Sequence, residues 1–141
     1  MADRLSPERR SALMSKVRGK DTTPEMRVRR LLYAMGVRYR LHRRELPGSP
    51  DIVMNKRRKV IFVHGCFWHR HPGCVKASFP KSNIGFWAIK FDKNIERDEL
   101  SERLLKSNGW ETLTIWECET RSIDDLTSKL ERFLAPLNPP S

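Results

Sequence analysis

Apolar residues recur along the chain at two spacings, and each spacing predicts one type of element. Spacings of three and four residues predict amphipathic helices, because such positions share one helical face. These helices are expected over residues 22–36, 86–107 and 122–134. Alternation and short apolar runs predict strands. These strands are expected over residues 37–41, 51–54, 60–63 and 110–116. The order indicates an α/β fold with a mixed central sheet flanked by helices.

The strand over 60–63 leads directly into an unusual group of side chains. Its four apolar residues predict burial on both faces. The next eleven residues, 64–74, hold three of the four histidines and two of the three cysteines of the chain, with Phe67 and Trp68 between them. Core packing does not require this density of ligands, so the segment predicts a metal site, a catalytic site or both.

Charge divides the chain into two parts. Residues 1–60 hold 17 Lys and Arg against 6 Asp and Glu, whereas the rest holds 11 of each, so the whole net charge of +11 comes from the first part. A polyanion is the expected partner, and nucleic acid is the commonest one. Ribosomal association and a solvated basic face are the alternatives. We expect a basic DNA-contacting arm over 1–21, a catalytic domain over 22–135 and a frayed tail over 136–141.

The cellular context follows from the N-terminus and the cysteines. The first ten residues are polar and lack the apolar region of a signal peptide, and no long apolar run follows. Three cysteines do not suit a secreted disulfide framework. A cytoplasmic protein without a membrane partner is expected, and in this reducing setting clustered thiols favour a metal.

The cysteines and histidines suggest a zinc site with one choice left open. Cys66, His71 and Cys74 lie within nine residues, and Cys118 follows a predicted strand end. Three cysteines and one histidine form a structural zinc set. His69 is a rival to His71, since only one of the two is needed. The alternative is three buried thiols and a surface histidine.

Hydrolytic chemistry is suggested by residues at the predicted strand ends. Asp51 and the main-chain carbonyl of Val63 offer the hard oxygen ligands that Mg²⁺ prefers for phosphodiester cleavage. His64 and His69 are candidate bases, because imidazole titrates near neutrality. Glu25, on the helix upstream, is a second acidic candidate. Taken singly, each has a structural alternative: Asp51 as a turn residue, Glu25 as part of a capping box, and each histidine as a structural side chain.

Aromatic residues fall into two groups. Phe67 and Trp68 lie among the ligands, where aromatic wedges that distort DNA are a plausible use. Trp110 and Trp116 are expected to pack within the sheet, and Phe86 is expected in the core, because large aromatics usually serve burial.

Taken together, these motifs resemble the very short patch repair (Vsr) mismatch endonucleases. The resemblance rests on Gly-Cys-Phe-Trp-His-Arg-His over 65–71, with Pro50-Asp51 and Glu25 before it and Lys-Asn-Ile-Glu-Arg-Asp over 93–98 and Trp-Glu-Cys over 116–118 after it. It runs from about Arg10 to Cys118. It implies a restriction-endonuclease-like fold of the PD-(D/E)xK type with a structural zinc, and nicking of DNA 5′ to the thymine of T:G mismatches that arise from 5-methylcytosine deamination. The strand lysine of the wider superfamily is absent here, as Phe62-Val63-His64 occupies its place.

Residue roles follow from the resemblance. It makes Asp51 and the Val63 carbonyl the Mg²⁺ ligands and His69 the general base, with Glu25 and His64 in support. The zinc ligands become Cys66, His71, Cys74 and Cys118. The DNA-binding set becomes Phe67, Trp68 and Trp87 as a major-groove wedge, Met14 in the minor groove, and Lys93 and Asn94.

The resemblance also implies partners. They are duplex DNA with a T:G mismatch and, downstream, mismatch-repair proteins and a DNA polymerase. A monomer is expected, because the mismatch is asymmetric. Two rival hypotheses remain: a restriction-like nuclease without mismatch specificity, and a zinc-stabilised DNA-binding module without catalysis.

Overall fold

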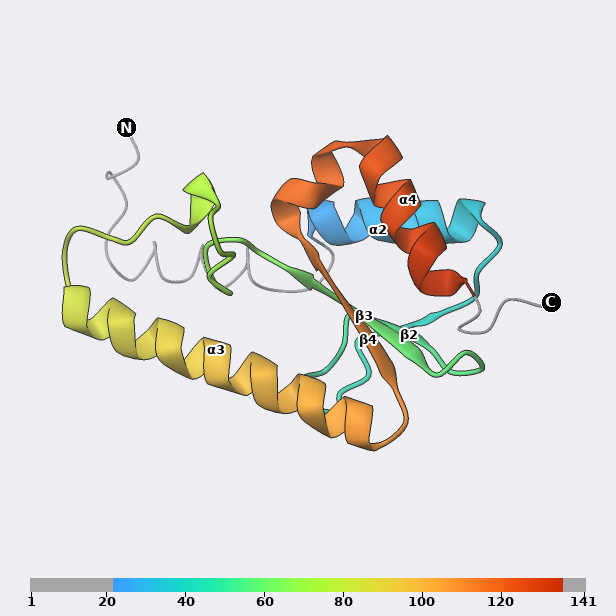
Figure 1. Ribbon diagram of the computed structural model, residues 1–141, viewed down its shortest axis with the longest axis horizontal. Helices are drawn as coiled ribbons and strands as arrows, with labels where there is room; N and C mark the ends of the chain where they lie inside the picture. Colours follow the sequence, from blue (N-terminus) through green and yellow to red (C-terminus); the bar gives the residue numbers. More distant parts are fainter. Residues whose placement is uncertain (1–21, 136–141) are drawn as a thin grey trace.

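Four strands form the middle layer of the structure, which is a computed structural model that describes residues 22–135 (Figure 1). They are β1 (Arg40–Leu41), β2 (Ile52–Met54), β3 (Lys59–His64) and β4 (Glu111–Trp116). The strands lie in the order β1-β2-β3-β4. The β1–β2 and β2–β3 pairs are antiparallel and the β3–β4 pair is parallel, so the predicted mixed sheet is confirmed.

Helices cover both faces of this sheet. Those described are α2 (Thr23–Ala34), α3 (Ile84–Ser107) and α4 (Ile123–Leu134), with short 3₁₀ turns η1 (Val75–Ala77) and η2 (Glu117–Arg121). In Figure 1, α2 and α4 lie together on one face and α3 runs along the other. The long connection between the parallel strands β3 and β4 carries α3, as a parallel crossover requires.

Two hydrophobic cores form because the sheet is covered on both sides. Alternate residues of β2 and β3 point to opposite faces, so the continuous apolar run over 60–63 supplies both cores. The core under α2 and α4 contains Val28, Leu32, Val37, Ile52, Met54, Ile61, Ile115, Leu126 and Leu130. The core under α3 contains Val53, Val60, Phe62, Leu105 and Trp110.

The helix starts predicted at Thr22 and Ser122 are confirmed by their caps, whereas α3 begins two residues before its predicted start. The side chain of Thr22 accepts a hydrogen bond from the backbone N–H of Glu25 at 3.4 Å, and that of Ser122 accepts one from Asp125 at 3.3 Å. Gly36 follows α2 with a φ of +78°, a left-handed conformation that glycine adopts without steric cost. These local signals fix where α2 meets the sheet.

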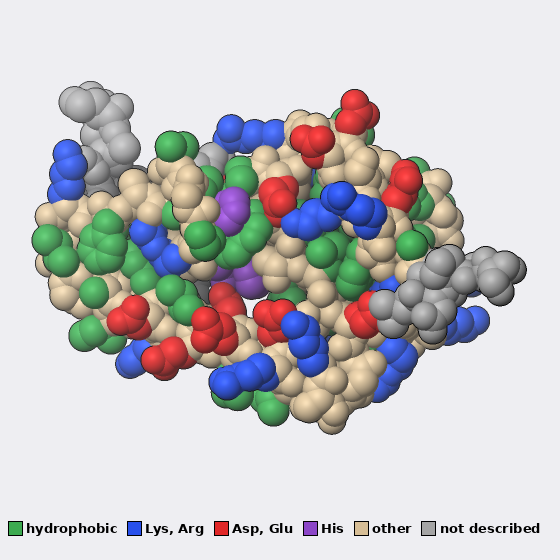
Figure 2. All heavy atoms as spheres, in the orientation of Figure 1, with side chains coloured by type: hydrophobic (Ala, Val, Ile, Leu, Met, Phe, Trp, Pro, Cys, Tyr) green, Lys and Arg blue, Asp and Glu red, His purple; other side chains and the backbone are tan. Residues whose placement is uncertain are grey.

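The prediction that Phe86 is a core residue was wrong. Its side chain is 61% exposed, and that of Ile89 is 59% exposed. Figure 1 shows that the first half of α3 extends beyond the four described strands, and Figure 2 shows hydrophobic side chains gathered at that end of the molecule. The face of α3 that does meet the protein carries Phe91, Asn94 and Leu105.

The strand predicted over 37–41 is shorter than expected. Only Arg40 and Leu41 pair with β2. Tyr39 instead turns toward α2, where its hydroxyl donates to the carbonyl of Arg29 at 3.2 Å. At the other end, His42 has a φ of +50°, which stops the extended backbone.

Some predictions concern other parts of the chain. The basic arm over 1–21, which contains Met14, and the tail over 136–141 lie outside the described residues, so the proposed domain boundaries stay predictions. Within residues 22–135, no helix has both the length and the apolar character needed to cross a membrane.

Candidate metal centre and active-site cleft

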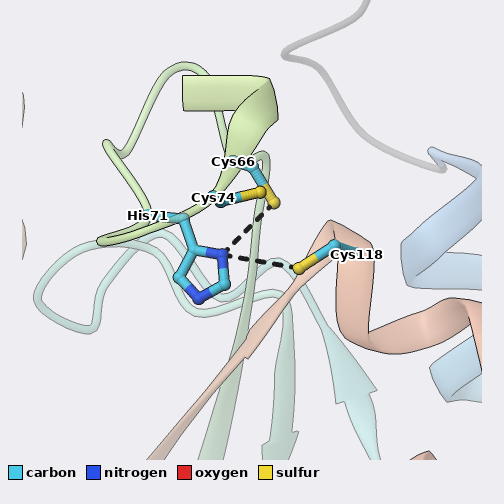
Figure 3. Close-up of side chains that lie close together, drawn as sticks. All are labelled: Cys66, His71, Cys74 and Cys118. Atoms are coloured by element: carbon cyan, nitrogen blue, oxygen red, sulfur yellow. Dashed lines mark hydrogen bonds between the residues drawn. The ribbon is translucent and has the colours of Figure 1, made fainter. Parts of the chain in front are cut away.

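Four metal-ligating side chains converge beside the ends of β3 and β4 (Figure 3). Cys66, His71 and Cys74 come from the loop after β3, and Cys118 comes from η2, directly after β4. The two strands are parallel neighbours, so their carboxyl ends meet at one edge of the sheet. One ligand atom from each residue lies within 4.8 Å of all the others. His69 lies outside this set and instead contacts an aspartate.

The spacing of this cluster fits a tetrahedral zinc ion. Bonds of about 2.3 Å to sulfur and about 2.0 Å to nitrogen place two tetrahedral ligand atoms about 3.6 Å apart. The Nδ1 atom of His71 lies 3.7 Å from the Sγ atom of Cys66 and 3.4 Å from that of Cys118. Burial raises the pKa of the Cys66 thiol to about 12, so the thiol keeps its proton in the absence of a metal. A bound metal would displace this proton. The cluster is therefore compatible with a zinc site.

Trp116 contributes to the metal centre as well as to the sheet. Its ring stacks on that of His71, with centroids 4.4 Å apart and an angle of 14° between the planes. Since Trp116 is the last residue of β4, the strand orients one of the four ligands. Sequence reasoning expected only strand packing from this side chain.

The carboxylate of Asp51 lies just before β2, next to the end of β3. Its Oδ2 atom accepts a hydrogen bond from the backbone N–H of Val63 at 2.7 Å. In an extended strand the N–H and C=O of one residue point to the same edge, so the Val63 carbonyl faces the Asp51 side. Burial raises the pKa of Asp51 to about 6, and the charge of Glu25 adds to this effect. These hard oxygen donors suit Mg²⁺.

A second buried carboxylate, that of Glu25, reaches this point from the first turn of α2. Only 2% of Glu25 is exposed, and its Oε2 atom accepts from Arg29 at 3.2 Å and contacts Nε2 of His42 at 3.0 Å. The other ring nitrogen of His42 lies 3.8 Å from Oδ1 of Asp51. The imidazole of His42 therefore bridges the two acidic side chains.

A hydrogen-bonded pair of His69 and Asp98 lies in the same region. The Nδ1 atom of His69 is 2.6 Å from Oδ2 of Asp98, which comes from α3. The ring of His64 stacks on that of His69, with centroids 3.7 Å apart and an angle of 7°. Burial lowers the pKa of His64 to about 3, and the neighbouring His69 acts in the same direction. His64 is therefore neutral at neutral pH and holds the His69 ring by stacking.

The carboxylates and the His64–His69 stack line one cleft of about 370 Å³, whereas His42 lies behind Glu25 and Asp51 and outside the lining. Among its lining residues are Glu25, Asp51, His64, His69 and Asp98. Figure 2 shows histidine side chains reaching the surface near the middle of the face in view. Carboxylates, imidazoles and main-chain oxygen thus meet in a space of the size that proteins use to bind small groups.

Aromatic side chains form one cluster at the edge of this cleft. Phe67 makes edge-to-face contacts with Trp68, Trp87 and Phe91, at centroid distances of 5.1, 5.8 and 5.3 Å respectively. Phe67 and Trp68 also line the cleft. The cluster joins the metal-binding loop to α3, so the same loop places metal ligands and aromatic side chains.

The two polar residues predicted to bind DNA differ in their placement on α3. Lys93 is exposed. Asn94 is only 7% exposed, and its side-chain amide donates to the carbonyl of Trp68 at 3.1 Å. Asn94 thus holds the backbone of the aromatic loop, and a DNA contact through either residue stays a prediction.

Comparison with known proteins identifies the family. The model of the DNA mismatch endonuclease Vsr family matches residues 2–76. The chain belongs to the Vsr family. It is 49% identical over 136 residues to the type II nicking enzyme V.XorIIP of Xanthomonas oryzae, covering 96% of this chain and 99% of that protein. It is 40% identical to V.NmeAIP of Neisseria meningitidis, covering 95% of both chains. It is also 40% identical to the DNA mismatch endonuclease Vsr of Escherichia coli, covering 92% of this chain and 82% of that protein.

Membership of the Vsr family decides between two of the hypotheses drawn from the sequence. The chain is a DNA nicking endonuclease, and DNA is its substrate. The hypothesis of a DNA-binding module without catalysis is therefore wrong. The resemblance to the Vsr endonucleases is confirmed.

Two residues of this region received no role from the sequence. His42 directly follows the strand predicted over 37–41, and it is the one histidine outside the dense segment. Asp98 belonged to a motif of the Vsr resemblance, yet no chemistry was assigned to it. Their partners lie 17 and 29 residues away along the chain. Sequence motifs therefore identify part of this Vsr site, whereas the contacts of His42 and Asp98 are found only in the folded structure.

Proposed function

We propose that this protein nicks one strand of duplex DNA on the 5′ side of the thymine in a T:G mismatch, in a Mg²⁺-dependent reaction. Such mismatches arise when 5-methylcytosine deaminates, and the nick would start very short patch repair. The observation that carries the proposal is the His69–Asp98 pair, with a 2.6 Å contact, in the same cleft as Asp51. It supplies a base beside a site for a cation.

His69 is proposed to accept the proton of the attacking water. When its Nδ1–H donates to the carboxylate of Asp98, its Nε2 atom carries the lone pair that a base needs. The aspartate fixes this tautomer and stabilises the imidazolium that forms. His64, neutral and stacked on the ring, keeps its plane fixed.

Asp51 and the Val63 carbonyl are proposed to hold the cation. Their donor atoms are hard oxygens, and the Val63 N–H already orients the carboxylate at 2.7 Å. Mg²⁺, when bound, neutralises charge on the phosphate and activates water. Glu25, buried beside His42, adds negative charge that attracts the cation. This strand-end arrangement supports the restriction-endonuclease-like fold of the PD-(D/E)xK type.

The aromatic cluster is proposed to read the mismatch. Phe67, Trp68 and Trp87 lie together at the cleft edge and form the proposed major-groove wedge. A T:G wobble pair costs less to unstack than a matched pair, so wedging favours the damaged site. A structural zinc at the neighbouring cluster would hold the loop rigid, since Cys66 directly precedes Phe67.

The biological setting remains part of the proposal. We expect a monomer in the cytoplasm, associated with the nucleoid, that hands nicked DNA to mismatch-repair proteins and a DNA polymerase. The bacterial origin of the three relatives described above supports this setting.

Strand-resolved cleavage tests the proposal. End-labelled duplexes with a T:G mismatch in varied flanking sequence are compared with matched C:G and T:A duplexes, with and without Mg²⁺. Asp51→Asn is the test variant, and Asp92→Asn, an exposed aspartate on α3, is the control. We expect a Mg²⁺-dependent nick 5′ to the mismatched thymine for wild type and control, and none for Asp51→Asn. Equal nicking of matched DNA would instead support the nuclease without mismatch specificity.

A further inference from the structure

We propose that His42 is a nitrogen ligand of the cation held by Asp51, and that this site therefore binds Mn²⁺ in preference to Mg²⁺. The inference rests on the cation site of the proposed function and specifies its chemistry. The cluster that carries it consists of Glu25, His42 and Asp51, whose ligand atoms lie within 4.8 Å of one another.

The two ring nitrogens of His42 have different neighbours. Nε2 lies 3.0 Å from the Oε2 atom of Glu25, and a carboxylate only accepts hydrogen bonds, so Nε2 is the donor. In the neutral ring, Nδ1 then carries a lone pair. That atom faces Oδ1 of Asp51 at a distance of 3.8 Å. Two atoms that can each donate a lone pair to a cation therefore lie close together.

The gap between these atoms has the size that a shared cation requires. At 3.8 Å the contact between Nδ1 of His42 and Oδ1 of Asp51 is too long for a hydrogen bond. Neighbouring ligands of one cation, with bonds of about 2.1 Å at right angles, lie about 3 Å apart. A shift of less than about 1 Å in either side chain brings the pair to this spacing. The other oxygen of Asp51 stays bound to the Val63 N–H.

The backbone holds His42 in place for this role. Its N–H donates to the carbonyl of Asp51 at 3.1 Å, which ties the two residues together directly. Its φ of +50° places the residue in the left-handed region, which is uncommon for residues other than glycine. The side chain is 14% exposed, so the ring has little freedom to turn away.

A nitrogen ligand changes which cations the site prefers. Mg²⁺ takes oxygen ligands almost exclusively, whereas transition metals accept imidazole. Mn²⁺ is close to Mg²⁺ in its preference for oxygen yet tolerates nitrogen, so a set of carboxylate, carbonyl and imidazole favours Mn²⁺. His42→Gln removes the imidazole and should weaken Mn²⁺ binding at least about tenfold. Mg²⁺ affinity should change by less than about threefold, since Mg²⁺ gains little from the ring.

Pulsed electron paramagnetic resonance with Mn²⁺ alone as the probe tests the assignment on the zinc-loaded protein. The nuclear modulation reports nitrogen bonded to Mn²⁺, and titration of the free-ion signal gives the affinity, with Mg²⁺ as competitor. The variants are His42→Gln and, as a control that removes a different imidazole near Asp51, His69→Ala. We expect nitrogen modulation in wild type and in His69→Ala, and none in His42→Gln.

The outcomes separate this inference from the proposed function. Absence of nitrogen modulation in wild type overturns the assignment of His42, and the ring would then be doubly protonated between two carboxylates. Persistence of the modulation in His42→Gln overturns it as well, because the nitrogen would then come from another histidine. The variant Asp51→Asn distinguishes failure of the Asp51 cation site from failure of the His42 ligand alone. If it leaves Mn²⁺ binding unchanged, the proposed Asp51 cation site fails as well; if it abolishes binding while His42→Gln has no effect, only the role of His42 fails.

Discussion

Replacing Asp51 by asparagine should stabilise the fold in the absence of Mg²⁺ while it removes nicking. The carboxylate is only 25% exposed, and burial raises its pKa from 3.8 to about 6. Because the raised pKa means that the folded state binds the proton more tightly, stability falls as pH rises from about 4 through about 6. Above that range the ionised carboxylate is a cost that the neutral amide does not carry.

The magnitude follows from the pKa values of Asp51. A shift of about two units corresponds to about 3 kcal/mol at neutral pH. Asparagine keeps an oxygen that can accept from the Val63 N–H, but a neutral amide accepts this hydrogen bond more weakly than a carboxylate, so we expect a net gain of about 2 kcal/mol. For a chain of 141 residues this amounts to roughly 6 °C in melting temperature.

Thermal unfolding at several pH values measures the effect. Zinc-loaded wild type, Asp51→Asn and the exposed control Asp92→Asn are compared in Mg²⁺-free buffer from about pH 3 to about pH 8, a range that spans both pKa values of Asp51. The gain for Asp51→Asn should be near zero at the acidic end and reach its full size above pH 6. The control should stay within about 0.5 kcal/mol of wild type. Added Mg²⁺ should stabilise wild type but not Asp51→Asn, and so narrow the gap.

A gain of equal size at every pH would refute the reasoning, because it would show that the charge of Asp51 is not the cause. A loss of stability at neutral pH would mean that the ionised carboxylate holds β2 and β3 together through the Val63 N–H more strongly than its burial opposes it.

Three other outcomes are expected. Cys118→Ala removes one of four ligands, so bound zinc, measured with a colorimetric chelator, should fall well below about one ion per chain. The free energy of unfolding should drop by several kcal/mol, because zinc binding is coupled to folding. A zinc content equal to that of wild type would contradict the assignment of the four-ligand cluster. Asp98→Asn removes the charge that fixes His69, so single-turnover nicking should slow by about 10–100-fold, with little change in the DNA dissociation constant. An unchanged rate would argue against a role of the His69–Asp98 pair in nicking. Arg70→Met leaves the backbone carbonyls of Phe67 and Ser78 without their donor, which should lower the free energy of unfolding in urea by about 1–3 kcal/mol. Phe86→Ser, at an exposed position, should lower it by less than about 0.5 kcal/mol. Equal losses for the two variants would contradict the buried role of Arg70 and the exposure of Phe86.

The sequence by itself determined the elements whose causes are local. The helix starts at Thr22 and Ser122 depend on side chains that bond to the backbone three residues later. The strand over 60–63 and the ligand-rich segment after it were legible because adjacent residues carry both signals. The family could also be recognised from the sequence, because its motifs are short runs of neighbouring residues.

Only the tertiary structure decided which distant side chains meet. His42 contacts Glu25 across 17 residues, and His69 contacts Asp98 across 29, so neither pair leaves a local pattern in the chain. Phe86 shows the same limit, because the helical spacing of its neighbours does not reveal that α3 extends past the sheet. Local propensity fixes where an element begins, whereas burial and charge environment depend on what the rest of the chain places beside it.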